Sequence, residues 1–329
     1  MPQRCDTHRP EIGMHDWALV LGAGEGKRLR SLTTTSSGVT VPKQFCSLAG
    51  GGSLLEEALH RSGVVAAPQR TAVVVAREHE RWWRPLLAST PAENVIVQPR
   101  NCGTAIGILL PLLSIMRRDP DATVLVLPSD HFVRNEDVLA QAMREALRQA
   151  HRATDDVVLL GIDPEEADPE LGYILPEPAP ADAGCGVRSF IEKPDSETAR
   201  RVIAAGGLWN SFIFAATARS LVTMLERAMP EIVMELAETS RRIDAGQASM
   251  AELASVYDRL PAVDFSRDVM QRFPQRLRVV RVPRCGWSDL GTPRRVAQVL
   301  HRERPVARAH GGAAFLNLAT QNAECRCVG

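Results

Sequence analysis

Short runs of apolar residues alternate with longer segments of helical periodicity in the first half of the chain. Five runs rich in Val, Leu and Ile predict buried strands, at residues 17–21, 71–76, 94–98, 123–127 and 157–162. Four segments with apolar residues at helical spacing predict helices, at residues 54–62, 78–89, 104–117 and 136–152. Because near-continuous apolar strands need cover on both faces, this alternation predicts an α/β sheet flanked by helices.

The pattern changes after residue 162. Residues 163–186 are rich in Pro, Gly and acidic residues, which predicts loops. Further strands are predicted at residues 187–193, 209–215 and 277–282, and further helices at 195–206, 217–245, 250–260 and 293–302. We therefore expect two halves, 16–162 and 163–302, that share one sheet, with a loose leader at 1–15 and a short tail at 303–329.

Composition narrows the class of protein. The chain has 329 residues, of which 45% are hydrophobic and 24% charged, so the bulk of it has enough apolar surface to fold. The 39 basic and 39 acidic side chains give a formal net charge of +0, which argues against a general nucleic-acid binder. No apolar run approaches the roughly 18 residues of a membrane span, and the polar N-terminus lacks the core of a signal peptide. We expect a cytoplasmic protein.

The cysteines do not form a recognisable framework. Seven are scattered along the chain, at positions 5, 46, 102, 185, 285, 325 and 327. An odd, unpatterned set does not predict disulfides. Cys325 and Cys327 lack two further zinc ligands at suitable spacing. We expect reduced thiols, and the role of this terminal pair stays open.

A glycine-rich loop follows the first predicted strand, at the edge of the sheet where ligands bind in α/β folds. Its three alternate glycines, in residues 22–28, let backbone N–H groups approach an anion, and Lys27 and Arg28 follow at once. A dinucleotide fingerprint would need glycine in place of Lys27, and a P-loop would need Ser or Thr in place of Arg28. The loop is therefore a candidate phosphate cradle of another kind, and a plain glycine turn is the alternative. A Ser/Thr-rich stretch then leads to Lys43, which Pro42 precedes, and this suits a lysine that closes on phosphate.

Several motifs in order carry a resemblance to a known family. They are GAGEGKRL (22–29), PKQF (42–45), QPRNCGTA (98–105), LPSDH (127–131), GYI (172–174), FIEKP (190–194), WNS (209–211) and GWSDLGT (286–292). Together they resemble the mannose-1-phosphate guanylyltransferases among the sugar-1-phosphate nucleotidylyltransferases, over about residues 17 to 295. The resemblance implies a Rossmann-like, mixed and mostly parallel sheet flanked by helices, the GT-A-like fold. The first half would bind the nucleotide and the second the sugar phosphate.

The family's reaction is the attack of a sugar 1-phosphate oxygen on the α-phosphorus of GTP, with pyrophosphate leaving. The resemblance therefore implies GTP and mannose 1-phosphate as partners and Mg²⁺ as cofactor. Lys27 stands where the family usually has Thr or Ser, and Phe212 where it usually has glycine. These departures keep another sugar 1-phosphate or another nucleoside triphosphate open as substrates. A non-catalytic nucleotide-sugar sensor is a further alternative, and a dehydrogenase is disfavoured by the failed fingerprint.

The resemblance also implies which residues form the site, at the positions of this sequence that match the family's motifs. Arg28 and Lys43 would meet the triphosphate, Lys193 the sugar phosphate, and Asp130 and Asp289 the Mg²⁺ ion, a hard cation that prefers oxygen ligands. The nucleotide would be bound by Leu21, Gly22, Ala23, Gly24, Gly26, Lys27, Gln98, Asn101, Gly103, Thr104 and Ser129. The sugar would be bound by Gly172, Tyr173, Glu192 and Asn210.

Structural roles compete with some of these assignments. Asp130 could instead cap the next helix, and His131 is more simply a hydrogen-bonded turn histidine than a catalytic one. Glu192 could lie on a solvated face. The sequence has none of the hexapeptide β-helix repeats and no fused isomerase domain, both of which occur in relatives. A homodimer is therefore compatible with the sequence, and the oligomeric state stays open.

Overall fold

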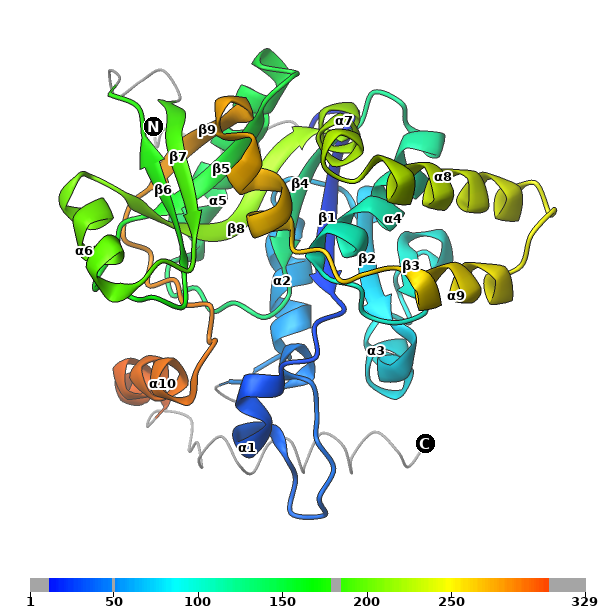
Figure 1. Ribbon diagram of the computed structural model, residues 1–329. Helices are drawn as coiled ribbons and strands as arrows, with labels where there is room; N and C mark the ends of the chain where they lie inside the picture. The colour runs from blue at the N-terminus through cyan, green and yellow to red at the C-terminus, as the bar shows by residue number, and fades with distance from the viewer. Residues whose placement is uncertain (1–11, 49–50, 179–184, 308–329) are drawn as a thin grey trace, which may run out of the picture.

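One nine-stranded sheet runs through the protein in the order β3-β2-β1-β4-β8-β5-β9-β7-β6 (Figure 1). The structure is a computed structural model and describes residues 12–48, 51–178 and 185–307. The strands are β1 (Asp16–Gly22), β2 (Thr71–Ala76), β3 (Val95–Gln98), β4 (Thr123–Pro128), β5 (Val157–Ile162), β6 (Gly172–Pro176), β7 (Cys185–Glu192), β8 (Leu208–Thr217) and β9 (Leu277–Val282).

Helices cover both faces of the sheet. They are α1 (Arg30–Thr33), α2 (Leu54–Ser62), α3 (Glu80–Leu86), α4 (Thr104–Arg118), α5 (Glu136–Arg152), α6 (Ser196–Ala204), α7 (Ala218–Ala228), α8 (Pro230–Asp244), α9 (Met250–Arg259) and α10 (Pro293–Ala307). Alternate residues of β1 belong to two separate cores: Leu19 packs with α4, α7, α8 and α9, whereas Val20 packs with α2, α3, α5 and α6. Both faces of β1 are therefore buried, which explains its unbroken apolar run.

The structure confirms most of the predicted elements and corrects others. The predicted helix 217–245 is two helices, because Pro230 takes the first position of α8 and Met229 before it has a non-helical backbone. The predicted loop 163–186 contains β6, which pairs with β7 and β8. The predicted helix 78–89 is shorter, with a 3₁₀ turn at residues 77–79 before α3.

The mixed sheet brings segments of both halves to one edge. Strands β3, β2, β1 and β4 run parallel, and β9 runs parallel to β5. The pairings of β8, β6 and β7 are antiparallel, and β8 lies between β4 and β5. Asn210 near the start of β8 therefore lies opposite Gly161 near the end of β5. Gly172 at the start of β6 lies opposite Glu192 at the end of β7.

Two further expectations concern membranes and thiols. Within the described ranges, no helix is both long and apolar enough to cross a membrane. The four described cysteines, at 46, 102, 185 and 285, are free thiols. Cys5, Cys325 and Cys327 lie outside the described residues, as do most of the expected leader and tail.

Candidate active site

A cavity of about 540 Å³ lies where these strand ends meet, a volume that suits a small-molecule ligand. Both halves of the chain line it. The predicted site residues around it are Leu21, Ala23, Gly24, Arg28, Gln98, Asn101, Gly103, Thr104, Ser129, Asp130, Gly172, Glu192, Lys193, Asn210 and Asp289. Residues that are far apart in the sequence thus converge as the motifs predicted.

The other predicted residues do not line the cavity. Gly22 ends β1, and Gly26 packs against Lys43, whose ammonium contacts the cavity residues Asp130 and Asp289. Lys27 is exposed and pairs with Glu25 at 2.7 Å, away from the cavity. Tyr173 is fully buried, so its side chain cannot reach a sugar in the cavity.

Lys43 joins the two predicted metal ligands. Its Nζ lies 2.9 Å from Asp130 Oδ2 and donates to the backbone carbonyl of Asp289 at 2.7 Å. Burial by itself would raise the pKa of Asp130, but the Lys43 ammonium holds that pKa below its usual range. Asp130 does not cap the next helix, because Asn135 caps α5. The Asp130 carboxylate therefore faces a cation and the cavity.

His131 is a buried neutral side chain. The indole N–H of Trp287 donates to its Nδ1 at 3.3 Å, and the two rings meet edge to face. Burial lowers the pKa of His131 to about 4. The hydrogen bond agrees with the prediction of a hydrogen-bonded turn histidine.

The residues present fit a hard divalent cation. The Oδ1 atom of Asp289 accepts from the backbone N–H of Gly291 and from Arg295. Within the described chain, no cluster of three or more His, Cys, Asp or Glu side chains could hold a metal. Asp130 and Asp289 could therefore supply only part of a coordination shell. Mg²⁺ typically binds through one or two carboxylates and completes its shell with phosphate oxygens and water.

The glycine-rich loop is fixed by Gln44, a side chain that the sequence analysis did not assign. Its Nε2 donates to the carbonyls of Gly22 at 3.0 Å and Gly24 at 2.8 Å, and Gln44 also lines the cavity. Its place in the PKQF motif, next to Lys43, was the available signal. Arg28, beyond the loop, pairs with Glu170 at 2.5 Å, and both side chains are about half exposed. Arg28 can therefore turn to a phosphate at little cost.

One end of the cavity is built from the QPRNCGTA segment. Gln98 is buried at the end of β3, and its Oε1 has no hydrogen-bond partner in the described structure. Gly103 has φ 87° and packs so closely that a Cβ there would lie 2.3 Å from the carbonyl oxygen of Val263. Only glycine fits both constraints. Thr104 accepts from the N–H of Phe265, which ties this end to the segment before β9.

The other end carries acidic and amide groups. A Cβ at Gly172 would lie 2.7 Å from Oε2 of Glu192, so the glycine leaves room for that carboxyl group. Burial, together with nearby Asp264, raises the pKa of Glu192. Lys193 Nζ lies 3.7 Å from the Glu192 carboxyl group, and Asn210 Oδ1 accepts from the N–H of Phe212.

Left-handed backbone gathers around the cavity. Among the described residues, Lys193, Phe212 and Leu290 are the non-glycine residues with positive φ, at 47°, 57° and 48°. Lys193 and Phe212 line the cavity, and Leu290 follows Asp289. The predicted strand through Lys193 in fact ends at Glu192. Such conformations cost of order 1–3 kcal/mol each and are typical of functional sites.

Comparison with known proteins agrees with this geometry. Residues 17–303 match the nucleotidyl transferase family. The chain belongs to that family. XanB, a xanthan biosynthesis protein of Xanthomonas campestris pv. campestris (strain B100), is 31% identical over an alignment of 304 residues. That alignment covers 89% of this chain and 61% of XanB. The mannose-1-phosphate guanylyltransferase ManC of Salmonella typhimurium is 30% identical over 288 residues, 84% of this chain and 58% of ManC.

A solved structure extends the likeness to the fold. It is described as a mannose-1-phosphate geranyltransferase from Thermus thermophilus, with a TM-score of 0.74 and 31% identity. The alignment covers 87% of this chain and 79% of that one. The predicted fold class and the resemblance to sugar-1-phosphate nucleotidylyltransferases are thus confirmed. The chain spans only 58% of ManC and 61% of XanB.

The sequence analysis did not identify part of the cavity wall. The segment before β9 lines it with Ala262, Val263, Asp264, Ser266, Arg267 and Asp268. Ser266, Arg267 and Asp268 lie in a stretch that resembles the family only loosely, and Ala262, Val263 and Asp264 belong to no motif. The missed residues also include Arg295, which donates to both Asp168 and Asp289, and Asp168 itself.

Proposed function

We propose that this chain transfers a guanylyl group from GTP to mannose 1-phosphate, giving GDP-mannose and pyrophosphate with the help of Mg²⁺. The observation that carries the proposal is the convergence of Arg28, Lys43 and Lys193 with Asp130 and Asp289 around one cavity. Similarity to proteins named mannose-1-phosphate guanylyltransferase supports the choice of substrates.

Repulsion between two polyanions is the main obstacle to this reaction. Two unit charges about 4 Å apart interact by about 4 kcal/mol at an effective dielectric constant of about 20. Cationic side chains must offset this repulsion when the two phosphates meet, and little covalent work remains for the protein. Cationic side chains lie at separate places around the cavity: Arg28 and Lys193 line it, and Lys43 contacts Asp130 and Asp289 in its wall.

Each cation has a defined task in the proposed step. Arg28 leaves Glu170 and, with Lys43, holds the triphosphate, while Lys193 holds the sugar phosphate. An oxygen of the sugar 1-phosphate forms a bond to the α-phosphorus as the bond from that phosphorus to the bridging oxygen of pyrophosphate breaks. The leaving group departs as pyrophosphate, and no proton transfer to a protein group is required.

Asp130 and Asp289 would hold the Mg²⁺ ion, as the carboxylate chemistry of the site allows. When bound, the ion supplies charge neutralisation and alignment of the two phosphates. Lys43 keeps Asp130 ionised and beside the cavity in the absence of ligand.

Base and sugar would occupy the two ends of the cavity. The buried, unpartnered Gln98 Oε1 suits the N–H donors of guanine, since a buried acceptor left unpaired is costly. Glu192 and Asn210 suit sugar hydroxyl groups at the opposite end. A site that hydrogen-bonds hydroxyls discriminates strongly against analogues that lack them.

The test is pyrophosphate release by the purified protein across the four nucleoside triphosphates and a panel of sugar 1-phosphates, with products identified by mass. GTP with mannose 1-phosphate is expected to give the highest kcat/KM, and Asp289→Asn is expected to abolish most of it. If the protein turns over only a different pair of nucleotide and sugar 1-phosphate, the substrates are that pair. Nucleotide binding without turnover for every pair would instead support a sensor.

A further inference from the structure

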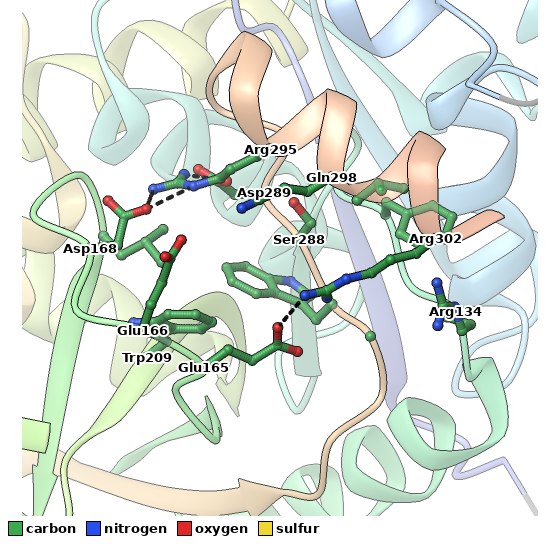
Figure 2. A pocket seen from close by; sticks show the side chains of 15 residues that line it. Arg134, Glu165, Glu166, Asp168, Trp209, Ser288, Asp289, Arg295, Gln298 and Arg302 are labelled. Carbon is green, nitrogen blue, oxygen red and sulfur yellow. Dashed lines mark hydrogen bonds and ion pairs between the residues drawn. The ribbon is translucent and has the colours of Figure 1, made fainter. Parts of the chain in front are cut away.

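A buried arginine connects the candidate active site to a second, smaller cavity. This cavity, of about 170 Å³, lies between α10, the 163–171 loop and Trp287, and Asp289 belongs to the walls of both cavities (Figure 2). Arg295, in the first turn of α10, lies between Asp168 and Asp289 (Figure 2). Its side chain is 9% exposed.

The guanidinium group of Arg295 contacts two carboxylates. Its Nε and one terminal nitrogen donate to Oδ2 of Asp168, the former at 3.0 Å. The other terminal nitrogen donates to Oδ1 of Asp289 at 2.5 Å. Because the planar guanidinium presents its donors in a fixed fork, the two carboxylates are held in a fixed relation to each other.

This arrangement leaves one oxygen of Asp289 available. Oδ1 accepts from Arg295 and also from the backbone N–H of Gly291 at 3.0 Å. Across the described residues, no hydrogen bond to Oδ2 of Asp289 is found. Arg295 therefore engages one oxygen of the carboxylate and leaves the other without a hydrogen bond, so that it can bind a cation.

Asp168, which holds Arg295, is itself fixed by hydrogen bonds. Oδ1 of Asp168 accepts from the N–H of Glu170. The hydroxyl of Tyr173 accepts from the N–H of Asp168 and donates to its carbonyl, at 2.8 and 3.0 Å. Trp209 donates to the same hydroxyl at 3.2 Å. Tyr173, which the motif suggested as a sugar ligand, thus supports the carboxylate that holds Arg295.

Other cations lie near Asp289 and would compete for its carboxylate if Arg295 did not hold it. Lys43 donates to the backbone carbonyl of Asp289. Arg28 and Arg295 are also close to this segment, because a Cβ built on Gly291 would lie 3.1 Å from a nitrogen of each. An Asp289 carboxylate released by Arg295 would be unpaired and largely buried, so it would capture one of these cations. That capture would occupy the metal-binding oxygen and remove a cation from the phosphates.

We propose that Arg295 is a positioning residue for nucleotidyl transfer, which holds Asp289 by Oδ1 and presents Oδ2 to the divalent cation, with Asp168 holding Arg295 in turn. The inference rests on the proposed function for its catalytic meaning. Its physical content concerns cation binding, which is measurable without substrates.

The experiment is a titration of the full chain with Mn²⁺ alone, with free Mn²⁺ followed by electron paramagnetic resonance. Arg295→Met is expected to weaken Mn²⁺ binding at least tenfold, and Arg295→Lys, which keeps one charged contact, less than that. The matched control is Arg294→Met on the same helix. Arg294 pairs with Glu166 of the same loop and is 70% exposed, so Mn²⁺ affinity should stay within twofold.

The outcomes separate this inference from the proposed function. Unchanged or tighter Mn²⁺ binding in both Arg295 variants would overturn the inference, because Arg295 would then only neutralise charge. Arg295→Lys keeps the test decisive if Arg295→Met does not fold. Asp289→Asn is titrated alongside: if it leaves Mn²⁺ affinity unchanged, the proposed metal site itself fails. If Asp289→Asn weakens binding and the Arg295 variants do not, only the inference fails.

Discussion

The Lys43 ammonium lies 2.9 Å from the carboxylate of Asp130, although the two residues belong to motifs in different parts of the chain. Lys43 follows a Ser/Thr-rich loop, and Asp130 follows the central strand β4. The contact places a buried cation beside a proposed metal ligand before any substrate binds.

Lys43→Met should lower kcat at least 100-fold, since it removes a fixed positive charge from the reacting phosphates. The loss of stability should stay below the 3–5 kcal/mol of a fully buried broken pair, because the Asp130 side chain is 35% exposed. Urea unfolding and initial rates measure the two effects. The double variant Lys43→Met/Asp130→Asn should recover part of the stability but no activity. Recovery of activity would show that Lys43 acts only by pairing with Asp130.

Glu170→Gln should strengthen GTP binding by up to about fivefold, because it removes the partner that holds Arg28 in the ligand-free protein. A half-exposed ion pair is worth about 0.2–1 kcal/mol, which sets this limit. Equilibrium dialysis measures the affinity. Glu165→Gln is the control, because Glu165 pairs with Arg302 on α10. Equal effects of the two variants would point to general electrostatics instead of release of Arg28.

Phe212→Gly should be more stable than Phe212→Ala by about 1 kcal/mol, the reverse of the usual order. The reason is the backbone φ of 57°, which glycine adopts freely and alanine does not. Urea denaturation of both variants gives the difference in the free energy of unfolding. Phe214 in β8 has no positive φ, so Phe214→Ala should be more stable than Phe214→Gly. The same order at both positions would contradict this account.

Glu192→Gln should raise stability at neutral pH while it lowers activity. Burial and Asp264 raise the pKa of Glu192, so the folded state binds a proton more tightly than the unfolded state does. Wild-type stability should therefore fall as pH rises from the ordinary pKa near 4.5 to the raised pKa of the folded state. The steepest slope expected from one such group is about 1.4 kcal/mol per pH unit.

Thermal unfolding of wild type and Glu192→Gln between pH 4 and pH 8 checks that dependence. The stability advantage of the variant should be smallest at the acidic end and grow with pH. Glu226→Gln, on the exposed end of α7, is the control and should show no such trend. A stability difference between the two proteins that stays constant from pH 4 to pH 8 would indicate that the charge of Glu192 does not destabilise the folded state.

The sequence by itself determined the sheet-forming segments and the glycine-rich loop. The strands at 71–76 and 157–162 have the predicted bounds, because strands buried on both faces are apolar along almost their whole length. Strand 277–282 also has the predicted bounds, although its Arg278 and Arg281 are not buried. Gly22, Gly24 and Gly26 could be identified because their backbone freedom is local and leaves a mark in the sequence.

Tertiary structure alone decided how these segments meet. That β8 lies between β4 and β5 follows from strand pairing across many intervening residues, which no local pattern encodes. The same holds for Arg295: its position in α10 has ordinary helical character, and only packing brings it between Asp168 and Asp289. Tyr173 shows the converse, since its motif suggested a ligand whereas burial made its hydroxyl a support for Asp168. Local chemistry selects the residue types, and long-range packing determines which of them touch.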